Sequence, residues 1–394
     1  MSPDSSARGV TPLGFDLLVR SGRIGGEPAA LLRKEAELLV DGHRDSVVSM
    51  AIWHGMAPLL ASYVALLAEP VAQSTKDALG KLYRKSLRHN LFLSKHLFAA
   101  LGALAANGVS AIPFKGPALS LRLYGDIALR QCSDLDIIVR PRDMVTSLET
   151  LQKLGFAPTR RLAPNQLQAL REQDFEVELE LEGVHLDLHW GVMPTFYALD
   201  FDIDAAWKRA RTAQIAGTKV LEFAPEDHFL ALTLHASKHF WAKLIWLVDL
   251  AQLIGSNPAF DWEALADRAR AMRAECLVSI AIDLLRDVME LPSSDLPPIS
   301  SVEGSHSVYS LARSNLYRDQ PDIEGLKRYW FFLRARDSAG DALRQVFRHA
   351  FRPSSGEWSK TSVSLPAAAY LPSHLWRLVA KFFRLAYHPH GPKE

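Results

Sequence analysis

The sequence predicts an α+β protein in which a small mixed β-sheet core lies between an N-terminal and a C-terminal helical region. Three observations support this prediction. Apolar residues recur mostly at helical spacing from about Leu17 to Gly108. From Val109 they form short runs or alternate strictly with polar residues, and after Pro225 the helical spacing returns. The three predicted domains are residues 1–95, 96–224 and 225–394.

The composition is that of an ordinary soluble protein. Apolar residues make up 48% of the chain and charged residues 23%. No apolar run reaches the roughly 18 residues that a transmembrane helix needs, and residues 1–11 are polar, which predicts a disordered leader without an export signal. The two cysteines, Cys132 and Cys276, belong to no C-x-x-C pair. This pattern argues against a disulfide scaffold or a thiolate zinc site and predicts a cytoplasmic protein.

The predicted core begins with a strand that leads into a tight turn. Val109 to Phe114 is a short apolar run, and Asn107-Gly108 before it supplies a stop for the preceding long helix. Lys115-Gly116-Pro117 forms the turn. Pro117 suits the first turn of a helix from Ala118 to Tyr124, which Gly125-Asp126 ends.

Two further segments complete the predicted sheet. Leu135 to Val139 is a strand, and Asp143 is predicted to cap a helix that runs to about Leu154. Residues 175–190 alternate between apolar and polar side chains, with Glu182-Gly183 as a two-residue hairpin turn.

The C-terminal region is predicted to be helical and partly basic. Asp227 to Ile254 and Trp262 to Leu291 show helical spacing, and further helices extend to about Tyr387. Residues 327–394 hold 12 Lys or Arg against 4 Asp or Glu, a surplus of 8, so the rest of the chain sums to −7 within a net charge of +1. A basic tail suits nucleic acid, anionic lipid or phosphate-rich substrates, although a solvated helical face has the same composition.

Two aspartates one residue apart are the strongest chemical signal. Asp134 and Asp136 stand at the start of an apolar strand, and side-chain alternation points both to the same face. Their Cα atoms are then roughly 6.6 Å apart, close enough for the carboxylates to share one ion or bridge two. Hard ions such as Mg²⁺ bind through a few carboxylates together with substrate phosphates. An acid that faces inward here also needs a compensating cation. A turn cap followed by a solvated acid would show the same letters.

A third acid lies on the second strand of the hairpin. Alternation puts His185, Asp187 and His189 on one face of that strand, and Leu186 and Leu188 on the other. A third carboxylate allows a site for two ions, which can stabilise the attacking and leaving oxygens of a phosphoryl displacement. An exposed polar face would alternate in the same way, so both interpretations stay open.

The turn that precedes the aspartate pair is suited to phosphate. Glycine at a strand-to-helix turn lets backbone amides approach phosphate oxygens, and the start of a helix favours negative charge. Gly116 takes this position, and Lys115 beside it can reach phosphates as a point charge. An ordinary tight turn would have the same sequence.

Taken together, these motifs resemble those of the bacterial uncharacterised nucleotidyltransferase family of the polymerase-β-like nucleotidyltransferase superfamily. The resemblance covers roughly residues 30–255 and includes the helical segment from His235 to Leu253. The family's motifs occur here in the same order, as Phe114-Lys115-Gly116, Leu123-Tyr124-Gly125-Asp126, Arg130, Asp134-Leu135-Asp136 and Leu186-Asp187-Leu188-His189-Trp190.

The resemblance implies a metal-dependent nucleotidyltransferase, which moves a nucleotidyl group from a nucleoside triphosphate such as ATP to an acceptor. Mg²⁺ or Mn²⁺ would be held by Asp134, Asp136 and Asp187, and Asp187 would help to activate the acceptor. The acceptor can be a small molecule, a peptide, a protein or RNA, and the oligomeric state stays open. The alternative is a non-catalytic nucleotide- or RNA-binding regulatory module on the same fold.

One departure from the superfamily concerns the phosphate-binding turn. The superfamily usually has Gly-Ser or Gly-Gly there, whereas Pro117 follows Gly116 and offers neither a hydroxyl nor an N–H group. The phosphate contacts must then be weak or come from other side chains, which are Lys115, Ser120, Arg122 or Arg130. Lys115 and Arg130 are preferred. The predicted nucleotide-binding residues are Lys115, Gly116, Arg130 and Ser133.

Two histidines offer a competing metal site. His235 and His239 are four residues apart on a predicted helix, a spacing that can bind zinc, but Ala236 stands where the metalloprotease motif has glutamate. Helical histidines beside aromatic residues are more often packed or solvated. Lys238 and Lys243 nearby can line a cleft between the core and the C-terminal helices, or lie on the surface.

Overall fold

The computed structural model describes residues 12–23, 39, 44–67, 71–160, 167–292, 294–297, 305–318 and 326–351. The predicted leader and the helices expected beyond residue 351 lie outside these residues. Among the described helices, none is both long and apolar enough to cross a membrane.

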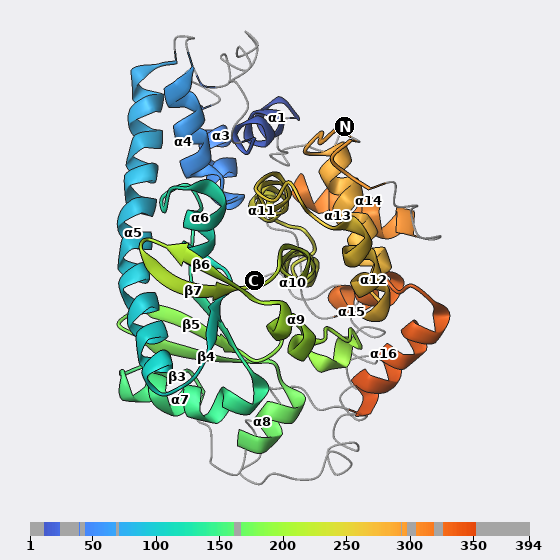
Figure 1. Cartoon of the computed structure of the whole chain (residues 1–394). Coiled ribbons are helices and arrows are strands. Elements are labelled where there is room, and N and C mark those ends of the chain that lie inside the picture. Colours follow the sequence, from blue (N-terminus) through green and yellow to red (C-terminus); the bar gives the residue numbers. More distant parts are fainter. Residues whose placement is uncertain are drawn as a thin grey trace, which may run out of the picture.

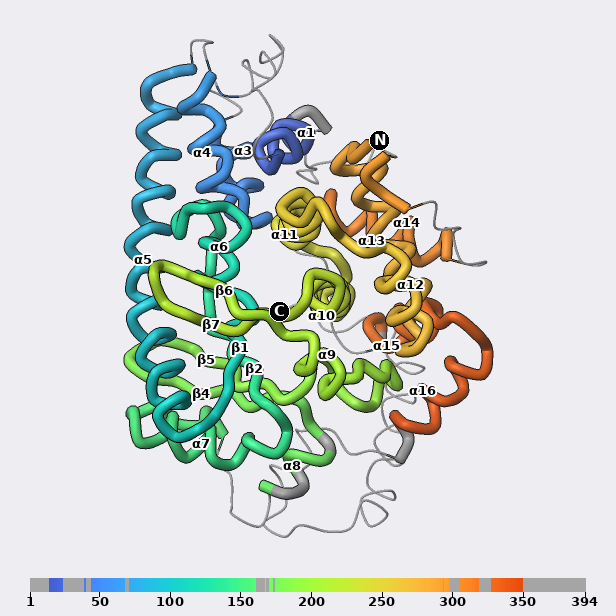
Figure 2. The backbone as a smooth tube through the Cα atoms, viewed as in Figure 1, coloured from blue at the N-terminus to red at the C-terminus, as the bar shows by residue number. Residues whose placement is uncertain are grey.

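The prediction of an α+β protein is confirmed (Figure 1). A mixed sheet of five strands has the order β1-β2-β5-β4-β3. The long helix α5 runs along one side of the molecule, and the C-terminal helices lie on the other side (Figure 2). The sheet therefore lies between helices from both ends of the chain.

The N-terminal helices lead to α5. They are α1 (Pro12–Ser21), α3 (Arg44–Trp53), α4 (Ala57–Leu66) and α5 (Gln73–Ala106). The predicted stop is confirmed, because Asn107 is the C-cap of α5 and Gly108 follows with φ +74°. Glycine adopts this left-handed conformation without steric strain, which lets the chain turn directly into the sheet.

The sheet combines antiparallel and parallel pairs. β1 (Ala111–Pro113) pairs antiparallel with β2 (Leu135–Val139), and β2 pairs parallel with β5 (Val184–His189). β4 (Glu176–Leu181) pairs antiparallel with β5 and with the two-residue strand β3 (Ala157–Pro158). The predicted hairpin turn is confirmed: Glu182 and Gly183 have φ 51° and 78°, as a type I′ turn requires.

Four helices belong to the core region: α6 (Gly116–Tyr124), α7 (Met144–Lys153), α8 (Leu167–Gln173) and α9 (Ile203–Arg209). The prediction that the Asp143 side chain caps α7 is wrong, because this side chain makes no capping hydrogen bond. Asp143 ends the 3-10 turn Pro141–Asp143 and already has helical φ and ψ of −93° and −1°. A capping side chain normally requires an extended backbone at that position.

A second, two-stranded sheet was not predicted. β6 (Arg211–Ile215) and β7 (Thr218–Glu222) form an antiparallel hairpin. Ala216 and Gly217 make its turn with φ 48° and 77°. The turn's first position usually holds Asn, Asp or Gly, so an alanine there hides the hairpin from sequence inspection.

The structure divides two helices that the spacing of apolar residues predicts to be continuous. The expected helix from Asp227 to Ile254 is interrupted at Phe240 and Trp241, which have φ 53° and 57° and bury their rings to 3% and 0% exposure. Arg273, with φ 60°, interrupts the expected helix from Trp262 to Leu291. The helices are α10 (Pro225–Lys238), α11 (Leu244–Gly255), α12 (Trp262–Ala271), α13 (Glu275–Asp287), α14 (Ser305–Leu316), α15 (Leu326–Arg334) and α16 (Ala339–Phe351).

The hydrophobic core falls into two clusters. One lies between the sheet, α5 and α7 and contains Leu97, Leu151 and Leu186. The other joins the two helical regions, since Phe15 and Leu60 belong to the same cluster as residues of α10, α11 and α13. The shared core fixes α10 and α11 beside the sheet, which places their side chains at the site described next.

Candidate functional site

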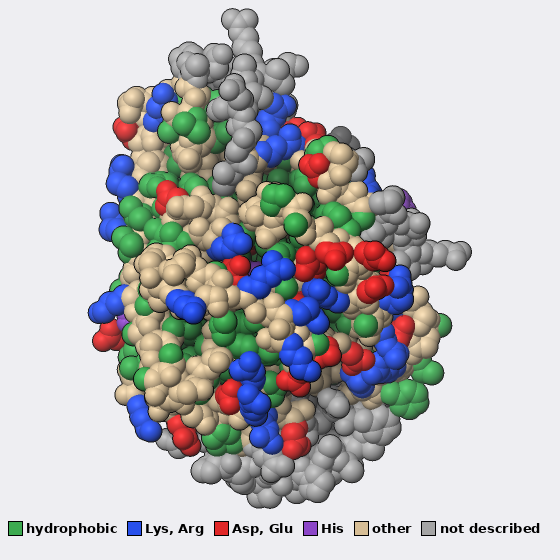
Figure 3. Space-filling model, in the orientation of Figure 1, with side chains coloured by type: hydrophobic (Ala, Val, Ile, Leu, Met, Phe, Trp, Pro, Cys, Tyr) green, Lys and Arg blue, Asp and Glu red, His purple; other side chains and the backbone are tan. Residues whose placement is uncertain are grey.

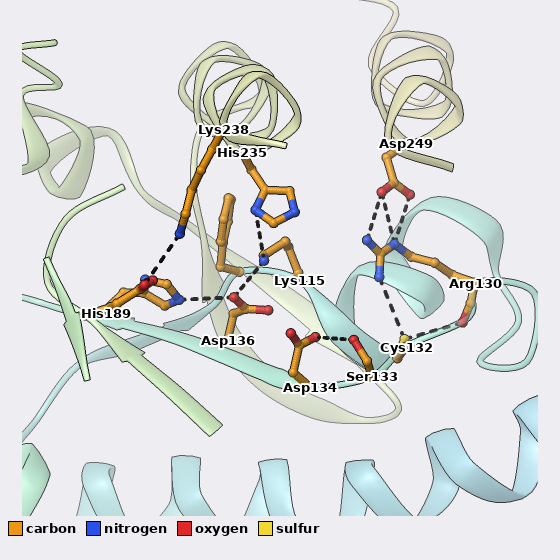
Figure 4. A network of polar contacts seen from close by, with 12 residues as sticks. Lys115, Arg130, Cys132, Ser133, Asp134, Asp136, His189, His235, Lys238 and Asp249 are labelled. Atoms are coloured by element: carbon orange, nitrogen blue, oxygen red, sulfur yellow. Dashed lines mark hydrogen bonds and ion pairs between the residues drawn. The ribbon is translucent and has the colours of Figure 1, made fainter. Parts of the chain in front are cut away.

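Asp136 is the most enclosed acid of the predicted site. It lies in β2 with 1% of its surface exposed. Its Oδ1 atom lies 2.7 Å from Lys115 Nζ and 3.1 Å from His189 Nε2 (Figure 4). Burial opposes ionisation, but Lys115 and His189 overcome it and hold the pKa of Asp136 well below its usual range. The other oxygen, Oδ2, is buried without a hydrogen-bond partner.

Lys115 supplies the cation that a buried acid at this position needs. Its side chain is almost buried, and Nζ lies between Asp136 Oδ1 and His235 Nδ1, at 2.7 Å and 3.3 Å. Burial lowers the pKa of Lys115, but the attraction of Asp136 and Asp134 outweighs it, so the pKa is raised. The ammonium is therefore committed to an internal ion pair, and the predicted phosphate contact stays a prediction.

Gly116 is required by the geometry of the turn. Its φ is +67°, and a Cβ atom there would lie 3.1 Å from the carbonyl oxygen of Asp134. The close approach joins the start of α6 to the start of β2. Any larger residue would strain the backbone and push these two elements apart.

Asp187 and Asp136 are brought together by the strand register. β2 and β5 run parallel with Asp136 opposite Asp187, so the two side chains share a face. Ligand atoms of Asp136, Asp187 and His189 all lie within 4.8 Å of one another. Burial raises the pKa of Asp187 to about 7; the charges of Asp136 and Glu176 add to this effect and His189 opposes it.

Asp134 lies at the edge of this cluster. It directly precedes β2, is half-buried, and accepts a hydrogen bond from the exposed Ser133 hydroxyl at 3.2 Å. The group of residues that could hold an ion contains Asp136, Asp187 and His189 and does not include Asp134. Metal binding by Asp134 and nucleotide binding by Ser133 stay predictions.

Arg130 is engaged in a buried ion pair with a residue of α11. Its Nε atom lies 3.0 Å from each carboxylate oxygen of Asp249 in α11 (Figure 4). The Tyr124 hydroxyl donates to the same carboxylate at 2.7 Å. Both charged residues are at most 6% exposed. The pair fastens the loop before β2 to α11. The predicted phosphate contact of Arg130 stays a prediction and would require this pair to open.

The alternative phosphate-binding side chains are also engaged. Arg122 Nε lies 2.9 Å from Glu222 Oε2, and the Ser120 hydroxyl donates to the Asp126 carbonyl at 2.8 Å. In this conformation the described cations around the turn mostly neutralise acids of the chain itself.

Lys243 differs from these cations. It precedes α11, is half-buried, and lies 5.5 Å from the centre of the Trp53 ring. It makes no ion pair with any residue that the structure describes. Burial lowers the pKa of Lys243, and the charge of Asp134 opposes this shift. Lys115, Arg122 and Arg130, by contrast, each have a carboxylate partner.

His189 and Glu176 lie at the site but have no role in the sequence-based predictions. The Nδ1 atom of His189 lies 3.3 Å from Glu176 Oε2, and Lys238 Nζ lies 3.4 Å from Glu176 Oε1. The alternation of residues 185–189 places His189 on the same strand face as Asp187, and this is the sequence signal that could have assigned His189 to the site. Glu176 gave none, because it is one of several alternating acids in β4.

The histidine pair at the end of α10 is packed among aromatic rings. The rings of His235 and His239 pack against each other and against Trp246, with centres 4.9 to 5.4 Å apart. Burial, followed by the charge of Lys115, lowers the pKa of His235, and burial lowers that of His239 to about 3. Neither belongs to the metal-compatible group found among the described residues.

A sequence model of a known family, described as "Uncharacterised nucleotidyltransferase", matches residues 42–290. The chain belongs to this family. The matched range contains the whole acidic cluster, together with α10 and α11. No curated protein matches the sequence. A solved structure of an antigenic nucleotidyltransferase-like protein from Paracoccidioides brasiliensis is 17% identical, with 50% of this chain and 91% of that chain covered and a TM-score of 0.29.

Proposed function

We propose that this protein is an enzyme that uses a divalent cation and moves a nucleotidyl group from a nucleoside triphosphate to an acceptor. The observation that carries the proposal is the juxtaposition of Asp136 and Asp187 on paired strands, beside the Gly116 turn. Two carboxylates held together in a largely buried site repel each other unless a cation lies between them. The family match supplies the general class of reaction.

The residues present fit a divalent cation. Asp136 Oδ2 is a buried carboxylate oxygen without a partner, and Asp187 offers a second carboxylate within 4.8 Å. Mg²⁺ and Mn²⁺ both accept such oxygen ligands. A bound ion would neutralise charge that develops on the transferring phosphoryl group.

The protein's own side chains have separate roles in this proposal. Lys115 keeps Asp136 ionised, and the Arg130–Asp249 pair fixes the loop that positions Asp134. Asp187 would help to hold the cation and to activate the acceptor's attacking group, since it shares a strand face with Asp136. Lys243 would contact the polyphosphate.

Calorimetry tests the nucleotide-binding part of the proposal. We expect ATP, GTP, CTP or UTP to bind in the presence of Mg²⁺ or Mn²⁺, and to lose most affinity when the cation is chelated. Asp136→Asn, which keeps the shape of the side chain, should bind the nucleotide as weakly with the cation present as wild type does when the cation is chelated. If no nucleotide binds under any of these conditions, the proposed function is wrong.

Replacing Lys243 with Ala should weaken triphosphate binding by roughly 10-fold to 100-fold, the usual value of a hydrogen bond to a charged group. Binding of the corresponding nucleoside should hardly change, since the ammonium acts on the phosphates. Lys219→Ala is the control, because Lys219 is exposed on β7 outside the acidic cluster. Equal losses for nucleoside and triphosphate would show that Lys243 has a structural role only.

A non-catalytic module is the second candidate, and one observation favours it. Lys115, Arg122 and Arg130 all neutralise acids of the protein itself, which leaves few cations for a triphosphate. Transfer of a labelled nucleotide to components of a cell extract separates the two candidates.

The non-catalytic module could bind RNA in place of a nucleotide. The face shown in Figure 3 has interspersed basic and acidic side chains among its described residues. RNA binding that weakens as the salt concentration rises would support an RNA-binding module.

A further inference from the structure

We propose that His189 is a direct ligand of the cation, with Glu176 as its orienting partner. The cation then has one imidazole nitrogen and two carboxylates as protein ligands, and the site binds a transition ion such as Mn²⁺ in preference to Mg²⁺. This inference rests on the proposed function and specifies the metal class of the same site.

The first argument is the position of His189. It lies two residues after Asp187 on β5, and its Cα register partner on β2 is Ile138, two residues after Asp136. Both acids and the imidazole therefore point to one face of adjacent parallel strands. One ligand atom from each lies within 4.8 Å of the others, which is compatible with a single ion.

The second argument is the orientation of the ring. His189 is 6% exposed, and its Nδ1 atom lies 3.3 Å from Glu176 Oε2. Histidines that bind metals almost always donate the N–H of the other ring nitrogen to a carboxylate or carbonyl group. With the Nδ1 proton donated to Glu176, the lone pair of Nε2 points toward Asp136 and the cluster. Lys238, 3.4 Å from Glu176 Oε1, holds the glutamate in turn.

The third argument is the set of oxygens that lack partners. Asp136 Oδ2 is buried and unpaired, although Oδ1 of the same carboxylate contacts both Lys115 and His189. Asp187 makes no hydrogen bond or ion pair with any described residue. A histidinium that merely bridged Asp136 and Glu176 would leave the buried Asp136 Oδ2 atom unsatisfied, and an unpaired buried polar group destabilises a protein by about 1–3 kcal/mol. A cation at the cluster satisfies both acids.

The ligand set determines the preferred ion. Mg²⁺ favours oxygen ligands and retains several waters. Imidazole nitrogen is a softer donor and shifts preference toward transition ions. A site with two carboxylates and one imidazole should therefore favour Mn²⁺ over Mg²⁺ by more than a site with oxygen ligands alone.

Pulsed electron paramagnetic resonance on the full chain loaded with Mn²⁺ tests the inference directly. Wild type should show hyperfine coupling from a directly bound ¹⁴N nucleus, and labelling with ¹⁵N-histidine should convert it to the ¹⁵N signature without any mutation. His189→Gln should lose the coupling. His185→Gln should keep it, because His185 is on the same strand face but exposed and lies 3.6 Å from Glu178.

Competition calorimetry gives a second readout. His189→Gln should lower the ratio of Mn²⁺ affinity to Mg²⁺ affinity by at least about 10-fold, and Glu176→Gln should weaken Mn²⁺ binding by about 10-fold to 100-fold while the nitrogen coupling remains. Bound Mn²⁺ without nitrogen coupling in wild type would overturn the inference, and Mg²⁺-dependent nucleotide binding would then still support the proposed function. Failure of the protein to bind either ion or any nucleotide would overturn both.

Discussion

Replacing Asp187 with Asn should abolish nucleotidyl transfer while the protein stays folded. An amide has nearly the shape of the carboxylate but can neither balance a metal charge nor accept a proton. Loss of a positioned general base alone lowers a rate by about 10²-fold to 10⁴-fold, and weaker metal binding adds to this loss. Triphosphate binding should decline less than transfer, because Asp136 and Lys243 remain.

Transfer of a labelled nucleotide to a cell extract is the measurement. Glu178→Gln is a matched control, since Glu178 lies opposite Asp187 in the β4–β5 register but is exposed. We expect the control to label the extract as wild type does. Equal labelling by wild type and Asp187→Asn would remove Asp187 from the mechanism. If wild type itself transfers no label, the non-catalytic module is favoured.

The same substitution should stabilise the metal-free protein at alkaline pH. Burial raises the pKa of Asp187 from 3.8 to about 7, so the folded state binds more protons than the unfolded state between these values. The stability of wild type relative to Asp187→Asn therefore falls as pH rises through this window. Urea unfolding with a chelator should show a larger advantage for the variant at pH 8 than at pH 4.5. An equal difference at both pH values would contradict the assigned shift.

The strands that carry the site were predictable because each is encoded locally. The apolar run from Leu135 to Val139 and the alternation around Glu182-Gly183 predict β2, β4 and β5 without information from the rest of the chain. The register that places Asp136 opposite Asp187 was not predictable. It depends on a parallel pairing between strands about fifty residues apart, which sequence periodicity does not encode.

The missed features depend on tertiary contacts. Phe240 and Trp241 break the expected helix without a glycine or proline, and their left-handed backbone is tolerated because both rings are buried. The buried ion pair of Arg130 is also absent from the sequence-based predictions, although its predicted phosphate contact stays a prediction. Its partner Asp249 is 119 residues away, and only the packing of α11 against α6 brings the two together.

Replacing Lys115 with Met should give the largest loss of stability among substitutions at the site. Methionine retains most of the apolar stem but removes the ammonium that lies 2.7 Å from Asp136 Oδ1. Both partners are at most 8% exposed at the side chain. Removing one member of a buried ion pair typically destabilises a protein by 3–5 kcal/mol, because the remaining charge is buried without compensation. Urea unfolding in the presence of a chelator measures this loss.

Three comparisons identify the cause of that loss. Lys238→Met removes the same group from a more exposed pair, with side chains 20% and 28% exposed, and should lose at most about 1 kcal/mol. Adding Asp136→Asn to Lys115→Met should restore much of the stability, since no charge is then left unpaired. Added Mn²⁺ should raise the melting temperature of Lys115→Met more than that of wild type, because the cation replaces the missing ammonium beside Asp136. If Lys115→Met is no less stable than Lys238→Met, Lys115 does not compensate Asp136, and its ammonium is then available to the triphosphate as the sequence predicted.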